Sequence, residues 1–454
     1  MWTNWRRQYC RAPQAAQRAR IAGFFGLLII VGCTPSAGAQ TGVGDRVLLG
    51  DLFTQVQRES PRVFAARSLA EAAQARVPGS SRPPDPQIQL GFMNYMIPRL
   101  TPMPTLGMTQ LQLMQMLPLG GKLSLAGRVA GAQASATDER ARDVTWEVRS
   151  ATAMAFYDLY ATDRGLDVAR ETLRLLQDIE KTAESMYRVG SGHQTDVLRA
   201  QVEIAKMAED TLRMQAMRAT MVARLNALLD RSLDVVVGAP ALPQFPDTVP
   251  ERRWLDSLAD RDRPMIRAGI DEVRSSEASE SLARKEIWPD LQVGVQYAQR
   301  GGAMGTDRMG SLMLGASVPV FARDRQFRMR DEAAAMKQMA QADLAAMRAE
   351  TRGKVGEAYA NLIRARSLTT LYLTTVLPQA EATVASAFAA YRVGSVDFMT
   401  LLDDRMSVNK YRQELFALDA DQGKAWADIE MLIGRELFDA NHTAATVAAT
   451  RGGK

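Results

Sequence analysis

Tyr187-Arg188-Val189-Gly190-Ser191 recurs unchanged as Tyr391-Arg392-Val393-Gly394-Ser395 in a chain of 454 residues. Other segments match in the same order at an offset of about 203 residues, among them DPQIQLG at 85–91 with WPDLQVG at 288–294. Such a long period indicates one large module that was copied once. We place the two copies at 48–239 and 251–438, joined by a proline-rich linker at 240–250.

Proline placement predicts a pair of long helices in each copy. No proline lies between Pro118 and Pro240, and only Pro378 follows Pro319. Long stretches without proline that are rich in Ala, Leu and Arg favour helices. The repeated motif would turn each pair into a hairpin at its glycine, and Pro378 would kink or interrupt its helix. The predicted helices span 122–186, 195–229, 324–387 and 396–434.

Narrow apolar seams run along two of these helices. Apolar residues follow a 3-4 spacing from Val408 to Leu432, and Leu198, Ala205, Leu212 and Ala219 lie seven residues apart. Such seams predict coiled-coil packing. Alanine at many seam positions buries little area, so each helix needs neighbours on both flanks. A soluble helical bundle is the alternative interpretation of this pattern.

Two runs of alternating polarity precede each helix pair. The run Leu291–Gln299 alternates strictly, and its length suits a tilted transmembrane β-strand. A half-buried sheet of a soluble protein would show the same alternation. Four strands cannot close a barrel, and an open sheet edge is not tolerated in lipid. Insertion would therefore require a homotrimer with twelve strands. The predicted strands span 87–95, 109–117, 291–299 and 311–320.

The N-terminal region predicts export from the cytoplasm. Five arginines precede a 12-residue apolar run at 21–32, as in a signal peptide. We assign 1–32 to a signal peptide, 33–47 to a linker and 439–454 to a flexible tail. Ile30-Val31-Gly32-Cys33 resembles the lipobox of bacterial lipoproteins, which makes Cys33 a candidate for lipidation. Cleavage after Ala39 is the alternative.

Charge and composition exclude several classes of protein. Without the five leader arginines, 51 basic residues face 51 acidic ones, which removes the main support for binding nucleic acid. Two Cys and two His are too few for a disulfide framework or a zinc site of the usual type. No phosphate-binding loop or catalytic constellation is present. The sequence therefore predicts a protein without enzymatic activity and without a cofactor.

The strand pairs, helical hairpins and duplication resemble the TolC family of bacterial outer-membrane efflux proteins. The resemblance covers about 48–438 and includes Asp196–Glu203 after the first tip, Leu401-Leu402-Asp403 after the second, and Leu117–Lys122 between strand and helix. It implies a mainly α fold with a small β part: a trimeric 12-stranded β-barrel in the outer membrane, continued by an α-helical barrel in the periplasm. It also implies a periplasmic adaptor protein and an inner-membrane RND-type pump as partners. The first tip is similar to members that accompany heavy-metal cation exporters.

The resemblance also implies a gate of acidic residues at the periplasmic end. Asp403 matches the second acidic position of the family, but Thr400 stands at the first and Val396 replaces a basic latch residue. Asp397, Asp404 and Asp196 are further candidates. Aspartates that merely decorate a solvated helix end are the alternative. The adaptor would dock on the repeated tips, at Tyr187, Arg188, Gly190, Ser191, Tyr391, Arg392, Gly394 and Ser395, although the glycines could serve only the turns.

Methionines gather around both strand pairs. Their thioethers are soft ligands that suit Cu(I) or Ag(I), but Met also fills lipid-facing or packed surfaces, which is the interpretation that the sequence favours. The function predicted overall is passive export, with heavy-metal cations as one possible substrate. A drug or protein conduit of the same fold, or a periplasmic coiled-coil lipoprotein scaffold, is the alternative. The clustered methionines are Met93, Met96, Met103, Met108, Met114, Met116, Met304, Met309 and Met313.

Overall fold

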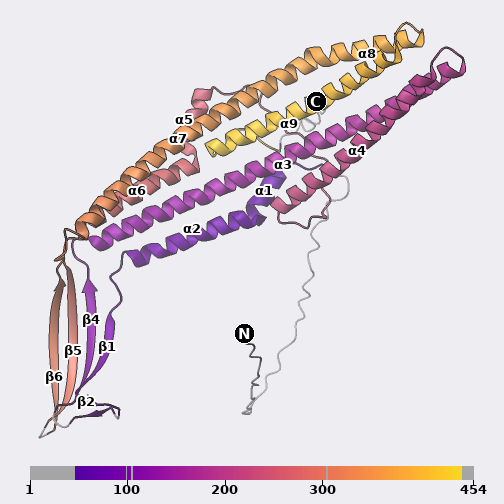
Figure 1. The fold of residues 1–454 in the computed structure, drawn as a ribbon. Helices are drawn as coiled ribbons and strands as arrows, with labels where there is room; N and C mark the ends of the chain where they lie inside the picture. The colour runs from indigo at the N-terminus through magenta and orange to yellow at the C-terminus, as the bar shows by residue number, and fades with distance from the viewer. Residues whose placement is uncertain (1–45, 99, 104–105, 303–304, 442–454) are drawn as a thin grey trace, which may run out of the picture. The chain divides into compact units, whose positions relative to one another are not determined.

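The fold consists of one structural plan used twice (Figure 1). The computed structural model describes residues 46–98, 100–103, 106–302 and 305–441, so the predicted signal peptide, Cys33 and residues 442–454 lie outside the described residues. The first copy comprises α1 (Leu49–Glu59), α2 (Pro61–Ser80), β1 (Gln87–Met93), β4 (Met108–Leu117), α3 (Lys122–Arg188) and α4 (Gln194–Leu228). The second comprises α5 (Arg252–Asp262), α6 (Pro264–Lys285), β5 (Asp290–Gly302), β6 (Gly305–Ser317), α7 (Gln326–Leu371), a π-helical turn η1 (Tyr372–Val376), α8 (Leu377–Arg392) and α9 (Phe398–Ile433).

Helices α1, α2, α5 and α6 were not predicted from the sequence. Pro61 and Pro264 each occupy the first position of a helix, where the missing N–H costs nothing. Proline therefore starts these helices and does not break them. Pro378 likewise leaves the chain helical, and the irregularity there is the π turn η1 directly before it. Beyond that turn the helix continues to Arg392, five residues past the predicted end.

Four antiparallel strands form one sheet in the order β1-β4-β5-β6. The predicted strand over 87–95 is wrong at its end, because Asn94 adopts a left-handed conformation and β1 stops at Met93. The short strands β2 (Tyr95–Met96) and β3 (Thr101–Pro102) then form a separate hairpin. Strand β5 is longer than predicted at both ends. Strand β6 begins six residues before the predicted start, but the prediction is wrong at the other end, because β6 stops at Ser317 and not at 320. The register of the two strands runs to Gly302 opposite Gly305. This part of the hairpin shows no alternation of polarity, because it contains glycines and the charged pair Arg300 and Asp307.

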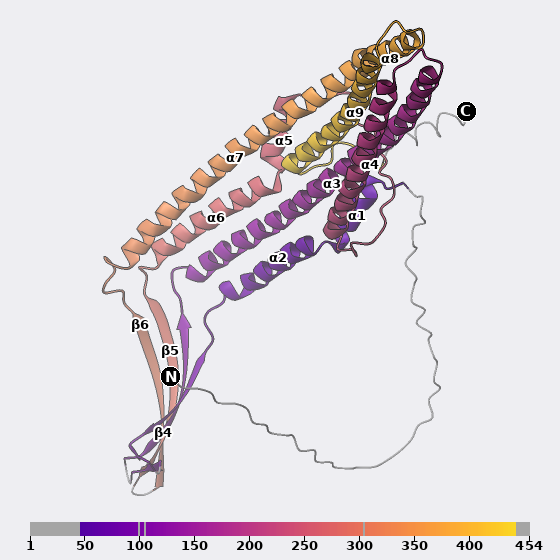
Figure 2. The same cartoon turned by 45° about the vertical axis from the view of Figure 1, so that its right-hand side comes forward.

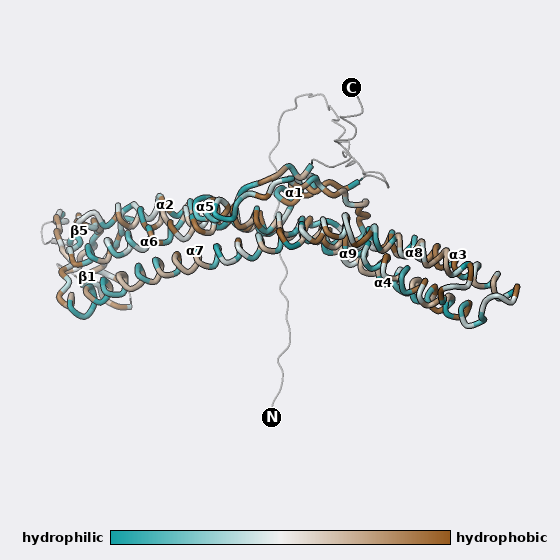
Figure 3. Tube along the Cα trace, turned by 90° about the horizontal axis from the view of Figure 1, so that it is seen from above, coloured by the Kyte–Doolittle hydropathy of each residue, from teal (hydrophilic) through white to brown (hydrophobic). Residues whose placement is uncertain are grey.

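The helices form a layer whose order changes along its length. Next to the sheet, α2 contacts α3, α3 contacts α6, and α6 contacts α7. Toward the hairpin tips, α4 contacts α3, α3 contacts α9, and α9 contacts α7 and α8. Figures 1 and 2 show the two hairpins running side by side to their tips. Hydrophobic and hydrophilic positions alternate along these helices (Figure 3), as expected for packing through narrow seams.

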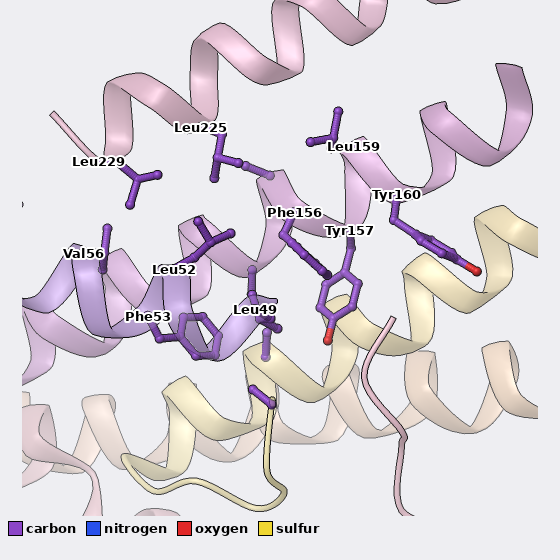
Figure 4. Packing of buried hydrophobic residues seen from close by; sticks show 14 of the residues in the cluster. Leu49, Leu52, Phe53, Val56, Phe156, Tyr157, Leu159, Tyr160, Leu225 and Leu229 are labelled. Atoms are coloured by element: carbon purple, nitrogen blue, oxygen red, sulfur yellow. The ribbon is translucent and has the colours of Figure 1, made fainter. Parts of the chain in front are cut away.

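The largest apolar core joins α1 to the middle of α3 and the end of α4 (Figure 4). Leu52, Phe53 and Val56 of α1 pack against Phe156 of α3 and its buried neighbours. Each large side chain that is fully buried contributes about 1.5–3 kcal/mol. A second core places Trp426 and Ile429 of α9 against α5 and α7. The described start of the predicted tail belongs to the packed structure as well, because Ala440 is buried in the first core.

A buried lysine ties the two copies together where the sheet meets the helices. Gly120 and Gly121 both have positive φ, which lets the chain turn from β4 into α3. Lys122 then donates from Nζ to Asp290 Oδ1 at 2.8 Å and to the carbonyl oxygen of Trp288 at 2.9 Å. Because Asp290 begins β5, this ion pair fixes the start of α3 against the second copy.

We expect Gly423→Ala to destabilise the fold. A methyl group on Gly423 of α9 would overlap the fully buried ring of Tyr157 on α3. Such overpacking costs about 1–3 kcal/mol in the free energy of unfolding. The matched control is Gly131→Ala in α3, which has no neighbouring atom within 4 Å and should gain about 0.5–1 kcal/mol. Equal denaturation midpoints for the two variants would contradict this packing.

Burial raises the pKa of Asp419 on α9 to about 6. The folded protein therefore binds this proton more tightly than the unfolded chain, and stability should fall as the pH rises from about 4 to about 6. Asp419→Asn should remove that loss and stabilise the protein at pH 7.5 by about 1–2 kcal/mol, allowing for partial exposure to water. The exposed control Asp178→Asn should change little. Unfolding curves at pH 4, 5, 6 and 7.5 test this, and parallel pH profiles for wild type and Asp419→Asn would contradict it.

Candidate functional site at the helix-hairpin tips

The two hairpin tips have the same backbone geometry. Gly190 and Gly394 have φ of 76° and 72°, a region that favours glycine. Ser191 donates its N–H to the carbonyl of Met186 at 3.0 Å, and Ser395 donates its N–H to the carbonyl of Ala390 at 3.0 Å. Both serine hydroxyls also donate to those carbonyls. The repeated sequence therefore builds the same helix stop twice, and the glycines have a structural role.

The tips differ in the tyrosine that begins each motif. Tyr187 is 46 % exposed, whereas Tyr391 is 4 % exposed and packs edge-on against Phe398 at 5.7 Å between ring centroids. Burial, together with the charges of Asp196 and Asp397, raises the pKa of Tyr391. Its hydroxyl has no hydrogen-bond partner in the described part of the chain. Tyr391 belongs to a third apolar core, which lies between the two hairpins and includes residues of α3, α4, α8 and α9. The second tip is thus anchored in this core, whereas the tyrosine of the first tip is exposed.

The structure separates the four predicted gate aspartates into different roles. Asp397 caps α9, since its carboxylate accepts the N–H of Met399 at 3.2 Å. Asp196 is buried in the first turn of α4. Asp403 is exposed and Asp404 half-buried, further along α9. Within residues 46–441 as described, neither of the last two forms an ion pair, so their charges are available to a partner or an ion.

Arg412 links three helices above the tips. Its guanidinium donates to Glu381 of α8 at 2.7 Å and to Glu171 of α3 at 3.0 Å. The first contact lies inside the second hairpin and the second contact joins that hairpin to the first. The carboxylate of Glu381, followed by that of Glu171, raises the pKa of Arg412 against the effect of burial. We call this set of three residues the Arg412 clamp.

Arg405 lies two turns from Arg412 on the same helix. Its Nε is buried and has no partner among the described residues. Burial and the nearby positive charge of Arg412 lower the pKa of Arg405. A desolvated guanidinium without a full set of acceptors is costly. This cost makes the interface between the two hairpins less stable than one packed only with apolar residues.

Sequence reasoning missed the Arg412 clamp entirely. Glu171 and Arg412 are 241 residues apart, and neither belongs to a recognisable motif. The only available signal is an acidic residue on α3 and one on α8 that could face a single arginine once the hairpins are aligned. Docking on the tips stays a prediction; six of the residues predicted for it are exposed, namely Arg188, Gly190, Ser191, Arg392, Gly394 and Ser395. Tyr391 is buried and cannot contact a partner in this conformation.

The described residues contain no cluster of three or more His, Cys, Asp or Glu side chains that could hold a metal ion. Among the described helices, none is long and apolar enough to cross a membrane.

A family model for outer membrane efflux proteins matches residues 52–231 and 255–435, once for each copy. The solved structure of CusC is similar with a TM-score of 0.74 and 17 % identity, covering 89 % of this chain and 96 % of that one. The outer membrane protein VceC from Vibrio cholerae gives 0.73 and 16 %, covering 86 % and 97 %. The outer-membrane channel OprN gives 0.72 and 18 %, covering 86 % and 90 %. No protein with a curated description matches.

We expect Arg412→Gln to loosen the second hairpin from the first. Two partly exposed ion pairs contribute about 0.2–1 kcal/mol each, so amide exchange around the second tip should accelerate about two- to thirtyfold. Hydrogen–deuterium exchange of peptides from 387–402 measures this. The control Arg174→Gln alters an exposed arginine of α3 close to Glu171. Equal exchange rates in the two variants would show that the Arg412 clamp does not stabilise the contact between the hairpins.

Proposed function

Because this chain belongs to the outer membrane efflux protein family, we propose that three copies of it close into one export duct that continues from the outer membrane into the periplasm. The protein is an efflux channel component of the bacterial outer membrane and is not an enzyme. The proposal concerns how the copies assemble, what gates the duct, and what passes through it.

The main observation behind the proposal is that each edge strand of the described sheet lacks a hydrogen-bonded partner on its outer side. Among the described strands, β1 and β6 each have one neighbour, and one face of the sheet is mostly apolar and exposed. Lipid cannot satisfy free backbone N–H and C=O groups. Neighbours alternate in direction, so β6 of one copy can pair antiparallel with β1 of the next. A heterologous contact of this kind forms a ring if the rotation closes, and three copies supply twelve strands.

Exposed apolar stripes on the edge helices support the same ring. The predicted seam of α4, whose residues lie seven positions apart, does not face α3. Its members Leu198 and Leu212 are 53 % and 66 % exposed. Instead, Ala200 and Met207 pack into the core between the hairpins. At the opposite edge of the layer, Leu371 and Leu373 are also exposed. In a ring, α4 of one copy would meet α7 and α8 of the next, and these stripes would be buried.

The gate of the proposed duct lies at the second tip. Three copies of Asp403 near the axis would repel one another and attract cations. The Arg412 clamp supplies the fastening that such repulsion requires, because it holds the second hairpin against the first. Opening would then mean release of this hairpin. Val396 stands where the family has a basic latch residue, so in this proposal the Arg412 clamp takes over that role.

The exposed tip residues would dock a periplasmic adaptor, which couples the duct to an inner-membrane RND-type pump. Small cations, including heavy-metal cations, are the substrates that the acidic tip favours; drug or protein export by the same fold is the second candidate. A periplasmic scaffold that never enters lipid is disfavoured, because it would leave the apolar sheet face and two free edges in water.

We expect Asp403→Ala to lower cation selectivity. Removing three carboxylates from the narrow end should reduce the preference for K⁺ over Cl⁻ and weaken block by multivalent cations by about tenfold, which corresponds to about 1.4 kcal/mol. Reversal potentials and block in planar lipid bilayers measure both effects. Glu209→Ala, an exposed acid on the edge helix α4, should leave them unchanged. If Asp403→Ala behaves like Glu209→Ala, Asp403 is no gate residue. Absence of any ion current from the purified wild type would overturn the duct itself.

A further inference from the structure

The two faces of the sheet differ in chemistry. Directly opposed residues of antiparallel strands point to the same face, so the register assigns every side chain. One face is apolar. The other face includes a row of Gln89, Gln112, Gln296 and Ser311 across all four strands. If the apolar face meets lipid, the glutamine face lines the lumen. The apolar face includes Ile88, Leu90, Phe92, Leu111, Leu113, Val293, Val295, Tyr297, Leu312 and Leu314.

Every methionine of the four sheet strands lies on the glutamine face. This placement is at odds with methionine as a lipid-facing filler, the interpretation that the sequence favoured. Met116 and Met309 remain 38 % and 40 % exposed, so these two side chains do not fill a buried gap either. The strand methionines on this face are Met93, Met108, Met114, Met116, Met309 and Met313.

Two of these methionines flank a glycine. Met114, Gly294 and Met313 form one row across β4, β5 and β6. A methyl group on Gly294 would lie 3.3 Å from Cγ of Met114 and 3.4 Å from Cε of Met313. Both side chains therefore lean over the same bare backbone, from opposite sides. Met116 follows Met114 on the same face of β4. The absent side chain of Gly294 lets the two methionine side chains approach each other over the backbone.

We propose that Met114, Met313 and Met116 form a thioether site for a soft monovalent cation, Cu(I) or Ag(I), on the luminal face of the sheet. The luminal location rests on the proposed duct. Neutral thioethers select soft monovalent metals over hard cations, which prefer carboxylates and water. The neighbouring Gln292 and Gln296 add no charge and no soft ligand.

The neutrality of the site fits a channel. A pore must bind its ion well enough to admit it and weakly enough to release it. Thiolates or a carboxylate cluster would hold the metal tightly, whereas uncharged sulfurs bind it weakly enough to release it. Three copies would place three such sites around the lumen, so an ion released by one could be taken by the next. Met309 and Met108 continue the same surface toward the outer end of the strands.

Silver(I) binding to the purified full-length assembly tests the site, in chloride-free nitrate buffer with bound metal counted after equilibrium dialysis. We expect one Ag⁺ per chain bound by this site in the wild type. Met114→Leu combined with Met313→Leu, which preserves volume, should lower the affinity at least tenfold or remove one ion per chain. The control Met336→Leu with Met339→Leu removes two exposed methionines of α7 and should bind as wild type does.

Assembly state and K⁺ conductance in nitrate are measured on the same samples. A strand variant that keeps both but loses Ag⁺ supports the site. Equal Ag⁺ binding by the strand variant, the α7 control and the wild type would overturn it, as would a conducting wild type that takes up no Ag⁺. Loss of assembly or conductance in the wild type would instead refute the duct. Gly294→Ala supplies a second check. Its methyl group would press against both methionine side chains without removing sulfur, so this variant should also weaken Ag⁺ binding.

Discussion

Backbone hydrogen bonding at the two free sheet edges is the constraint on which the whole arrangement depends. A four-stranded sheet with an apolar face has no stable place in lipid while the N–H and C=O groups of β1 and β6 lack partners. In the proposed ring, pairing of β6 with β1 of a neighbour would satisfy these groups and set the order of the copies. The same closure would bring the edge helices together and give the exposed leucines of α4 a partner surface.

A small number of contacts fix the positions of the helices relative to the sheet and to one another. Lys122 binds Asp290 and so locks the start of α3 to the first residue of β5. Further along, the close approach of Gly423 to Tyr157 sets the distance between α9 and α3. Toward the tips an apolar core also joins the hairpins, but Arg412 adds a polar link between them and Arg405 is incompletely satisfied. In the proposed gated duct, these polar contacts are the ones that would separate on opening.

Duplication produced two copies with one backbone plan and different roles. Tyr187 and Tyr391 stand at the same position of an identical motif, yet one is exposed and the other buried. The difference arises from their surroundings: Phe398 packs on Tyr391, and His193 and Gln194 occupy the equivalent region of the first tip. Tyr391 is thereby packed inside the chain, while Tyr187 remains exposed.

Much of the fold was readable from local patterns. Proline-free stretches located α3, α4 and α9 to within two residues, and alternation located the four strands. The misses have physical causes. Pro61 and Pro264 resemble helix breakers but start helices, and β5 and β6 continue through glycines and charges where alternation fades. The Arg412 clamp and the methionine row over Gly294 depend on contacts between distant segments, which no local pattern encodes. The motif predicted the tips, but not which tyrosine would be buried.

Cross-linking between the two sheet edges tests ring closure most directly. In a chain with Cys10 and Cys33 replaced by Ser, Gln89→Cys on β1 and Ser311→Cys on β6 place one thiol at each edge. Within one chain these strands are three strand spacings apart, about 14 Å, so a shorter bifunctional maleimide can join only neighbouring copies. The account predicts a ladder that ends at a covalent trimer and requires both cysteines. Product that stays monomeric in membranes, or a ladder that continues past three copies, would contradict it.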